Sequence, residues 1–117
     1  MKHVITSLFI LSLLSACSSK GKIPPDVLNI NTMKPIVWDM ISTEQNIVAS
    51  DPVRIDSFKL PLIAGYEKVF AVHKIDKNTF YKSFDFYEAH PDLLKVLMDS
   101  VSSYGMRKKA ELYNRYK

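Results

Sequence analysis

The residues of this chain that could do chemistry are few, and their spacing argues against a catalytic site. Ser83, Asp85 and His90 are the residue types of a hydrolase triad. On a helix, however, Ser83 and His90 would lie about 10 Å apart along the axis, whereas a nucleophile and its base need about 2.6–3.2 Å. Beyond the first few residues His73 is the only other histidine, which is too few for a histidine-rich zinc site. We therefore expect no enzyme activity, no catalytic residue, no metal site and no cofactor.

Cys17 is the strongest candidate for covalent chemistry, because it is the only cysteine in the chain and cannot form an internal disulfide bond. Residues 1–3 form a short positive segment that contains Lys2, residues 4–14 form an uncharged and mostly apolar run, and residues 15–16 are small. This order is typical of an export signal, and the run is shorter than the ~20 residues that a membrane-spanning helix needs. We expect residues 1–16 to be a cleaved signal peptide.

The sequence Leu14-Ser15-Ala16-Cys17 resembles the lipobox of bacterial lipoproteins. The resemblance implies that the thiol takes a diacylglyceryl group and that, after cleavage, the new amino group is acylated, for example with palmitate. Two or three acyl chains anchor a protein stably, at ~0.8 kcal/mol per buried methylene. Cys17 is thus the predicted lipidation site and residues 17–25 the predicted lipidated cysteine and tether. The alternative is an ordinary secretory signal with an incidental cysteine.

The residues after Cys17 and the charge of the chain bear on location and partners. Ser18–Lys22 contains no acidic cluster. Surface-exposed lipoproteins of Bacteroidota usually resemble one another in carrying acidic residues just after the cysteine. We therefore expect this chain to lie on the periplasmic face of the outer membrane. The formal net charge of +4 is weak support for nucleic-acid binding, and we expect no nucleic-acid partner. Five cations crowd the C-terminus: Arg107, Lys108, Lys109, Arg115 and Lys117. They suit a solvated helix end, or else contact with anionic lipid or an acidic partner.

Apolar periodicity and helix-end signals predict an all-α fold, a small bundle of about four helices within residues 26–117. The predicted helices are roughly 33–49, 60–74, 77–89 and a last one that begins at Pro91. Asn31 or Thr32 is expected to cap the first helix, with Pro35 in its first turn, and Asp76 the third. Gly105 is expected to weaken or end the last helix.

One motif carries a family resemblance. Phe80, Ser83 and Tyr87 precede a His90-Pro91 junction and an apolar helix. Together with Ile23-Pro24-Pro25-Asp26 and Trp38-Asp39-Met40, this motif resembles a lipoprotein family of Bacteroidota called domain of unknown function 4296. The resemblance covers about residues 23–101. It implies a small helical lipoprotein and no known activity.

Four residues of the matched region form a predicted polar network: Glu44, Ser83, Tyr87 and His90. Glu44 falls between Met40 and Val48 on the predicted apolar face, where a carboxylate is costly unless it is hydrogen-bonded. We expect it to accept a hydrogen bond from Tyr87 or Ser83; alternatively the helix ends early or rotates and leaves Glu44 in water. The imidazole of His90 either satisfies nearby backbone or acts as a metal ligand or base.

Two functions from different classes remain. The first is a membrane-tethered protein-interaction module in an envelope complex, supported by Trp38 and Tyr113, which lie off the predicted apolar faces. The second is a small-molecule or lipid-binding bundle, for which Met33, Met40 and Met98 would suit an adaptable cavity lining. These methionines could equally be ordinary core residues.

Overall fold

The structure, a computed structural model, describes residues 21–50, 52 and 59–117. The predicted signal peptide, residues 1–16, and Cys17 lie outside these ranges. The described residues form four helices and no strand: α2 (Ile30–Ser50), α3 (Lys59–His73), α4 (Lys77–Glu88) and α5 (Pro91–Arg115). The predicted all-α bundle of about four helices is therefore confirmed.

Helix α2 begins three residues earlier than predicted, because Asn29 is its capping residue. The Asn29 side-chain oxygen accepts a hydrogen bond from the backbone N–H of Thr32 at 3.0 Å, so neither Asn31 nor Thr32 is the cap. With this start Pro35 lies in the second turn rather than the first. There it removes one helical N–H donor, to the carbonyl of Asn31.

Both ends of α3 and the starts of α4 and α5 lie within one residue of the predicted positions. Helix α3 ends because Lys74 has a left-handed backbone, with φ of 54°. The N–H of Ile75 then donates to the carbonyl of Phe70 at 3.0 Å, the hydrogen bond of a Schellman motif. Asp76 caps α4 as predicted, accepting from the N–H of Thr79 at 3.0 Å. Pro91 is the first residue of α5, where a missing N–H costs nothing.

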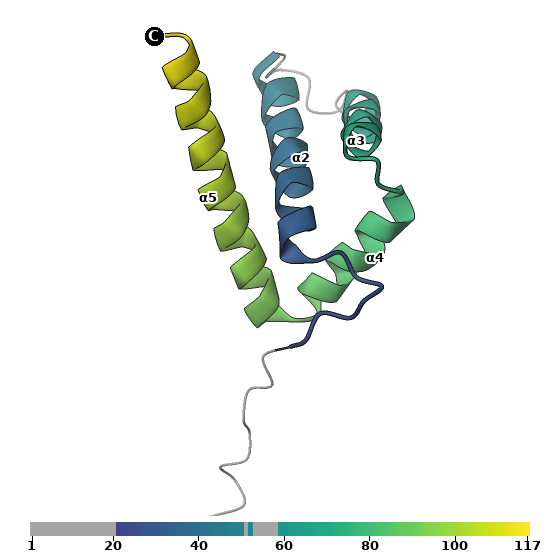
Figure 1. Ribbon diagram of the computed structural model, residues 1–117. Coiled ribbons are helices and arrows are strands. Elements are labelled where there is room, and N and C mark those ends of the chain that lie inside the picture. Colours follow the sequence, from purple (N-terminus) through teal and green to yellow (C-terminus); the bar gives the residue numbers. More distant parts are fainter. Residues whose placement is uncertain (1–20, 51, 53–58) are drawn as a thin grey trace, which may run out of the picture.

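Helix α2 stands at the centre of the bundle, with α5 on one side and α3 on the other, while α4 crosses near its base (Figure 1). Helices α2 and α5 run in the same direction, so their C-terminal ends lie at the same end of the molecule (Figure 1). Ten buried side chains form the core: Val27, Met33, Ile36, Val37, Val69, Phe70, Phe80, Tyr87, Leu97 and Val101. The buried side chains of α2 all lie in the first half of the helix. Val48, near the C-terminal end of α2, is 51% exposed.

Trp38 lies in the contact between α2 and α5, where the sequence predicted an exposed aromatic side chain. A Cβ atom at position 105 would overlap the Trp38 ring, so Gly105 lets this ring lie directly on the backbone of α5. The ammonium of Lys109 also lies 5.5 Å from the ring centroid. Gly105 therefore neither ends nor interrupts α5, because contact with Trp38 offsets the low helix propensity of glycine.

Candidate functional site

Residues 21–29, which we term the strap, lie against α4 and the start of α5. The hydroxyl of Tyr87 donates to the carbonyl of Leu28 at 2.8 Å. The hydroxyl of Ser83 accepts from the N–H of Leu28 at 2.9 Å and donates to the carbonyl of Thr79 at 2.8 Å. Both side chains are fully buried, and this burial raises the pKa of the Tyr87 hydroxyl. The two predicted residues thus meet, and what they hold is the backbone of Leu28.

Further contacts hold the strap on either side of Leu28. Val27 is buried in the core, and the carboxylate of Asp26 pairs with Lys82 of α4 at 2.6 Å. The hydrogen bond from Lys82 lowers the pKa of Asp26. Gly21 lies so close to Leu93, in the first turn of α5, that a Cβ at position 21 would be 3.1 Å from a Leu93 methyl. The first residue of the strap therefore lies beside the start of α5.

Glu44 has a different partner from the one predicted. Its carboxylate accepts a hydrogen bond from the hydroxyl of Tyr66 on α3, whereas the hydroxyls of Ser83 and Tyr87 bond backbone groups of Thr79 and Leu28. Because the second half of α2 packs against α3, Glu44 faces that helix from an exposed position. The pKa of Tyr66 is raised, mainly because burial desolvates its hydroxyl and secondly because this hydroxyl donates to Glu44.

A pocket of about 320 Å³ opens beside Glu44 and Tyr66. Its walls come from all four helices and include the aromatic rings of Phe80, Tyr81 and Phe84 and the side chains of Met40 and Met98. Two of the three methionines predicted to line a cavity therefore do so. The third, Met33, is fully buried in the core, so it is an ordinary packing residue.

His90 satisfies backbone at the junction between α4 and α5, as one of the two sequence interpretations has it. Its Nδ1 lies 2.6 Å from the carbonyl oxygen of Phe86, and the two rings are 4.2 Å apart. Nδ1 therefore carries the proton and donates it to that carbonyl. Within the described ranges, no three histidine, cysteine or acidic side chains are grouped so that they could hold a metal ion.

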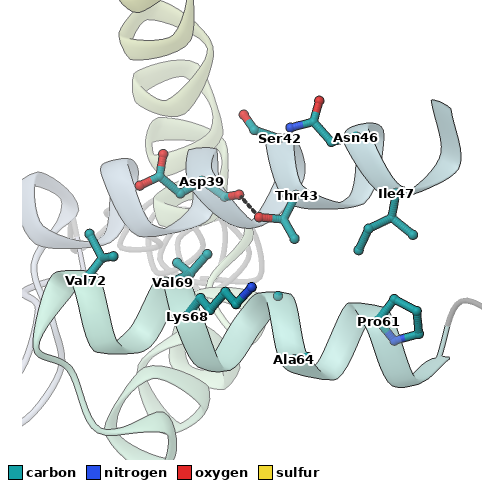
Figure 2. A pocket seen from close by; sticks show the side chains of 11 residues that line it. Asp39, Ser42, Thr43, Asn46, Ile47, Pro61, Ala64, Lys68, Val69 and Val72 are labelled. Atoms are coloured by element: carbon teal, nitrogen blue, oxygen red, sulfur yellow. Dashed lines mark hydrogen bonds between the residues drawn. The ribbon is translucent and has the colours of Figure 1, made fainter. Parts of the chain in front are cut away.

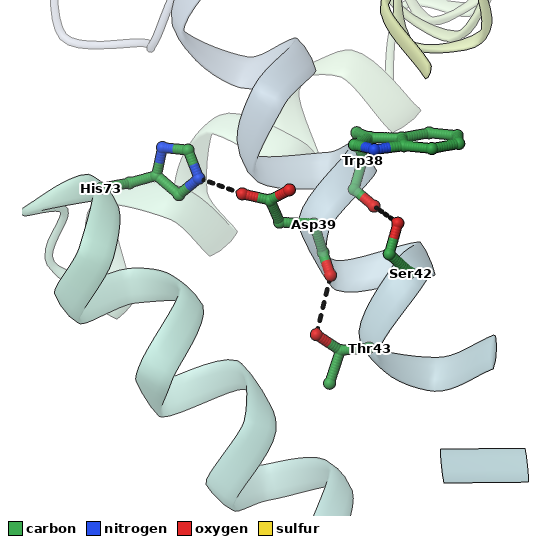
Figure 3. A network of polar contacts seen from close by, with 5 residues as sticks. All are labelled: Trp38, Asp39, Ser42, Thr43 and His73. Carbon is green, nitrogen blue, oxygen red and sulfur yellow. Dashed lines mark hydrogen bonds and ion pairs between the residues drawn. The ribbon is translucent and has the colours of Figure 1, made fainter. Parts of the chain in front are cut away.

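The sequence interpretation missed a polar contact between Asp39 on α2 and His73 on α3. Nε2 of His73 lies 2.7 Å from a carboxylate oxygen of Asp39 (Figure 3). A groove of about 640 Å³ runs beside it between the two helices, lined by polar and apolar side chains that include Asn46, Lys68 and Val72 (Figure 2). The one signal available in the sequence is that the spacing of His73 puts it on the same side of a helix as Tyr66, Val69 and Phe70. Asp39 carried no such signal.

Two hydroxyl side chains of α2, those of Ser42 and Thr43, lie near Asp39 in the chain. The hydroxyl of Ser42 donates to the carbonyl of Trp38 at 2.9 Å, and that of Thr43 donates to the carbonyl of Asp39 at 2.8 Å. Both hydroxyls are thus turned onto their own helix (Figure 3). The arrangement joins two helices and lacks the geometry of a triad.

The end of α5 and the two residues after it, 106–117, form what we term the C-terminal face, and every one of these residues is exposed. The face holds the five predicted cations and one acidic residue, Glu111. It also exposes large apolar or aromatic side chains: Met106, Leu112, Tyr113 at 69% and Tyr116 at 85%. The predicted exposure of Tyr113 is confirmed. Exposed aromatic rings, methionine and arginine together are typical of protein interfaces.

Of three comparisons with known proteins, one gives a match. A family model described as Domain of unknown function (DUF4296) matches residues 24–111, which cover the strap and nearly all of the bundle. No curated protein matches, and no solved structure matches. None of the described helices is both long enough and apolar enough to cross a membrane.

Proposed function

Since the chain belongs to the DUF4296 family, whose description assigns no activity, we propose a role from its own residues. The protein is a lipid-anchored lipoprotein of the cell envelope, has no catalytic activity, and binds an envelope protein through the C-terminal face. The observation that carries this proposal is that face, in which five cations and exposed aromatic rings occur together over residues 106–117.

The position of the strap supports a defined orientation of the bundle. Four chain steps separate Cys17 from Gly21, and each spans at most about 3.6 Å, so a lipid on Cys17 keeps Gly21 within about 14 Å of the membrane. Gly21 lies beside the first turn of α5. The 25 residues of α5 are about 37 Å long at 1.5 Å per residue. The C-terminal face is therefore at the opposite end of α5 from Gly21 (Figure 1).

The chemistry of the C-terminal face indicates what kind of surface it binds. Cations at a helix C-terminus need no partner for stability, but exposed tyrosines beside them add apolar contact area without charge. Tyrosine, methionine and arginine are enriched in protein interfaces, where lysine is depleted. We expect an acidic partner surface with apolar sites for Tyr113 and Tyr116, since charge complementarity increases the association rate.

The composition of the tether bears on where the protein is located. A short tether without acidic residues favours retention on the periplasmic side of the outer membrane over surface display. A partner for the C-terminal face then belongs to the periplasm or to the periplasmic part of an outer-membrane protein.

Crosslinking in intact cells tests the interface. A photoreactive amino acid is placed at position 113, on the C-terminal face, or at position 88, an exposed site of α4. In the strain with the photoreactive residue at position 113, mass spectrometry should identify one envelope protein that is bound through an acidic segment. The strain with the residue at position 88 should give no such adduct. The paired change Arg107→Glu and Arg115→Glu should abolish that adduct while membrane fractionation stays unchanged.

Two outcomes count against the interface. Adducts with lipid alone would mean that the C-terminal face binds headgroups, and equal adducts from both positions would mean that it has no specific partner. Membrane fractionation of the same strains reports on the anchor separately from the interface.

A further inference from the structure

The pocket beside Glu44 shares no residue with the C-terminal face, so what it binds does not depend on the partner proposed above. Its walls are mainly apolar, and four aromatic side chains contribute to them: Tyr66, Phe80, Tyr81 and Phe84. Tyr81 is 42% exposed and Met98 40% exposed. Large apolar side chains gathered around an opening are typical of a binding site.

The charged group in the lining of the pocket is negative. Among the described residues that line it, Glu44 is the one charged side chain. Tyr66 occupies one oxygen, Oε1, of this carboxylate, and a carboxylate can accept about four hydrogen bonds. Glu44 therefore keeps the capacity to accept from a ligand at the pocket opening.

The aromatic rings favour the same kind of ligand as the carboxylate does. The face of an aromatic ring carries partial negative charge and attracts cations within about 6 Å, most of all those that are weakly hydrated. Phe80 and Phe84 are stacked, with centroids 5.9 Å apart, and Tyr81 meets Phe80 edge to face at 5.4 Å. The rings thus form one continuous wall next to a negative charge.

The size of the pocket limits the ligand. Its volume of about 320 Å³ equals roughly ten water molecules at ~30 Å³ each. A ligand of about ten non-hydrogen atoms would fill it, and a lipid with two long acyl chains would not fit.

We propose that this pocket binds a small organic cation, with an apolar or aromatic body among the rings and a protonated amine or quaternary ammonium against Glu44. The body displaces water from the apolar walls. The cationic group gains both the carboxylate and the aromatic faces, which a neutral molecule of the same shape does not.

The methionines of the chain make this proposal testable residue by residue. The full chain is labelled with ¹³C at the methionine methyl groups, and the probe is 2-phenylethylammonium, with 2-phenylethanol as its neutral counterpart. The signals of Met40 and Met98 should shift and saturate with the cation. Those of the buried Met33 and the exposed Met106 should not move. The alcohol should bind at least about tenfold more weakly, since it lacks the charge.

A pair of matched variants tests the role of the carboxylate. Glu44→Gln should reduce the affinity for the cation severalfold, toward that for the alcohol, because only the aromatic rings then attract the charge. Glu88→Gln, which removes the same charge from an exposed site on α4 outside the pocket, should leave it unchanged. The spectrum of each variant without ligand reports whether it is folded.

Each of the following results would overturn the proposal. The cation produces no saturable shift up to about 10 mM; the alcohol binds as tightly as the cation; Glu44→Gln binds the cation as the native chain does; or Met106 shifts together with Met40 and Met98, which would mean non-specific association.

Discussion

Replacing Tyr87 with phenylalanine should weaken the hold of α4 on the strap while leaving the helices in place. The phenyl ring fills the same buried space, so no cavity forms. The carbonyl of Leu28 loses its donor. A buried acceptor left without a partner costs about 1–3 kcal/mol. Leu28 is only half-buried, so water can partly replace the hydroxyl, and we expect the free energy of unfolding to fall by about 1–1.5 kcal/mol.

Urea unfolding of the full chain, followed by far-ultraviolet circular dichroism, measures this loss. The midpoint should fall while the slope with urea stays constant, because the surface exposed on unfolding is the same. In a thermal scan, a loss of this size lowers Tm by roughly 4–10 °C in a domain of about 100 residues. A second variant, Ser83→Ala, should speed hydrogen exchange at the amide of Leu28, because this N–H donates its hydrogen bond to the serine hydroxyl.

Tyr113→Phe is the matched control, since it removes the same hydroxyl from a side chain that is 69% exposed. It should change the free energy of unfolding by less than about 0.5 kcal/mol. If Tyr87→Phe proves as stable as this control, or if the Leu28 amide stays equally protected in Ser83→Ala, then the two hydroxyls do not hold the strap.

Three further predictions concern the anchor, the contact between α2 and α5, and alkaline pH. Cys17→Ala should block processing and release the protein from membranes; if the variant still sediments with them after a high-salt wash, the lipid is not the main anchor. Gly105→Ala should move the ring of Trp38, lower the free energy of unfolding by about 1–3 kcal/mol through overpacking and change the tryptophan fluorescence; unchanged emission and stability would contradict the contact. Folding raises the pKa values of Tyr66 and Tyr87, so their contribution to stability is complete below their unfolded value of about 10 and is lost as the pH rises through the folded values. The urea midpoint should therefore fall above pH 10, and it should fall less in the double variant Tyr66→Phe and Tyr87→Phe. An equal fall in the native chain and in this variant would exclude these hydroxyls as the cause.

The sequence predicted the helices because the signals that set them are local. Asp76 caps α4 through a hydrogen bond to a residue three positions away, and Pro91 starts α5 because of its own ring geometry. Such interactions need no knowledge of the rest of the fold. The start of α2 was wrong by three residues because Asn29, Asn31 and Thr32 are all good caps, and only packing of the strap selects among them.

The partners of the site residues were harder to predict, because they depend on how helices rotate against one another. Glu44 was placed on an apolar face that the sequence treats as continuous. In the fold, the first half of that face enters the core and the second half turns toward α3, where Tyr66 is the nearest donor. The buried roles of Ser83 and Tyr87 depend on Leu28, which precedes them by 55 and 59 residues. No periodicity within a helix contains that information.

The strap also determines how the molecule would bear a pulling force. Tension applied at Gly21 passes first to the start of α5 and then, through Asp26, Val27 and Leu28, to α4. The load therefore reaches two helices sideways before it can act along the axis of α2. A helix pulled from its end unravels one turn at a time, whereas here the contacts of Asp26, Val27 and Leu28 must break before Ile30 is strained. The first turn of α2 is thereby protected from whatever holds the N-terminus.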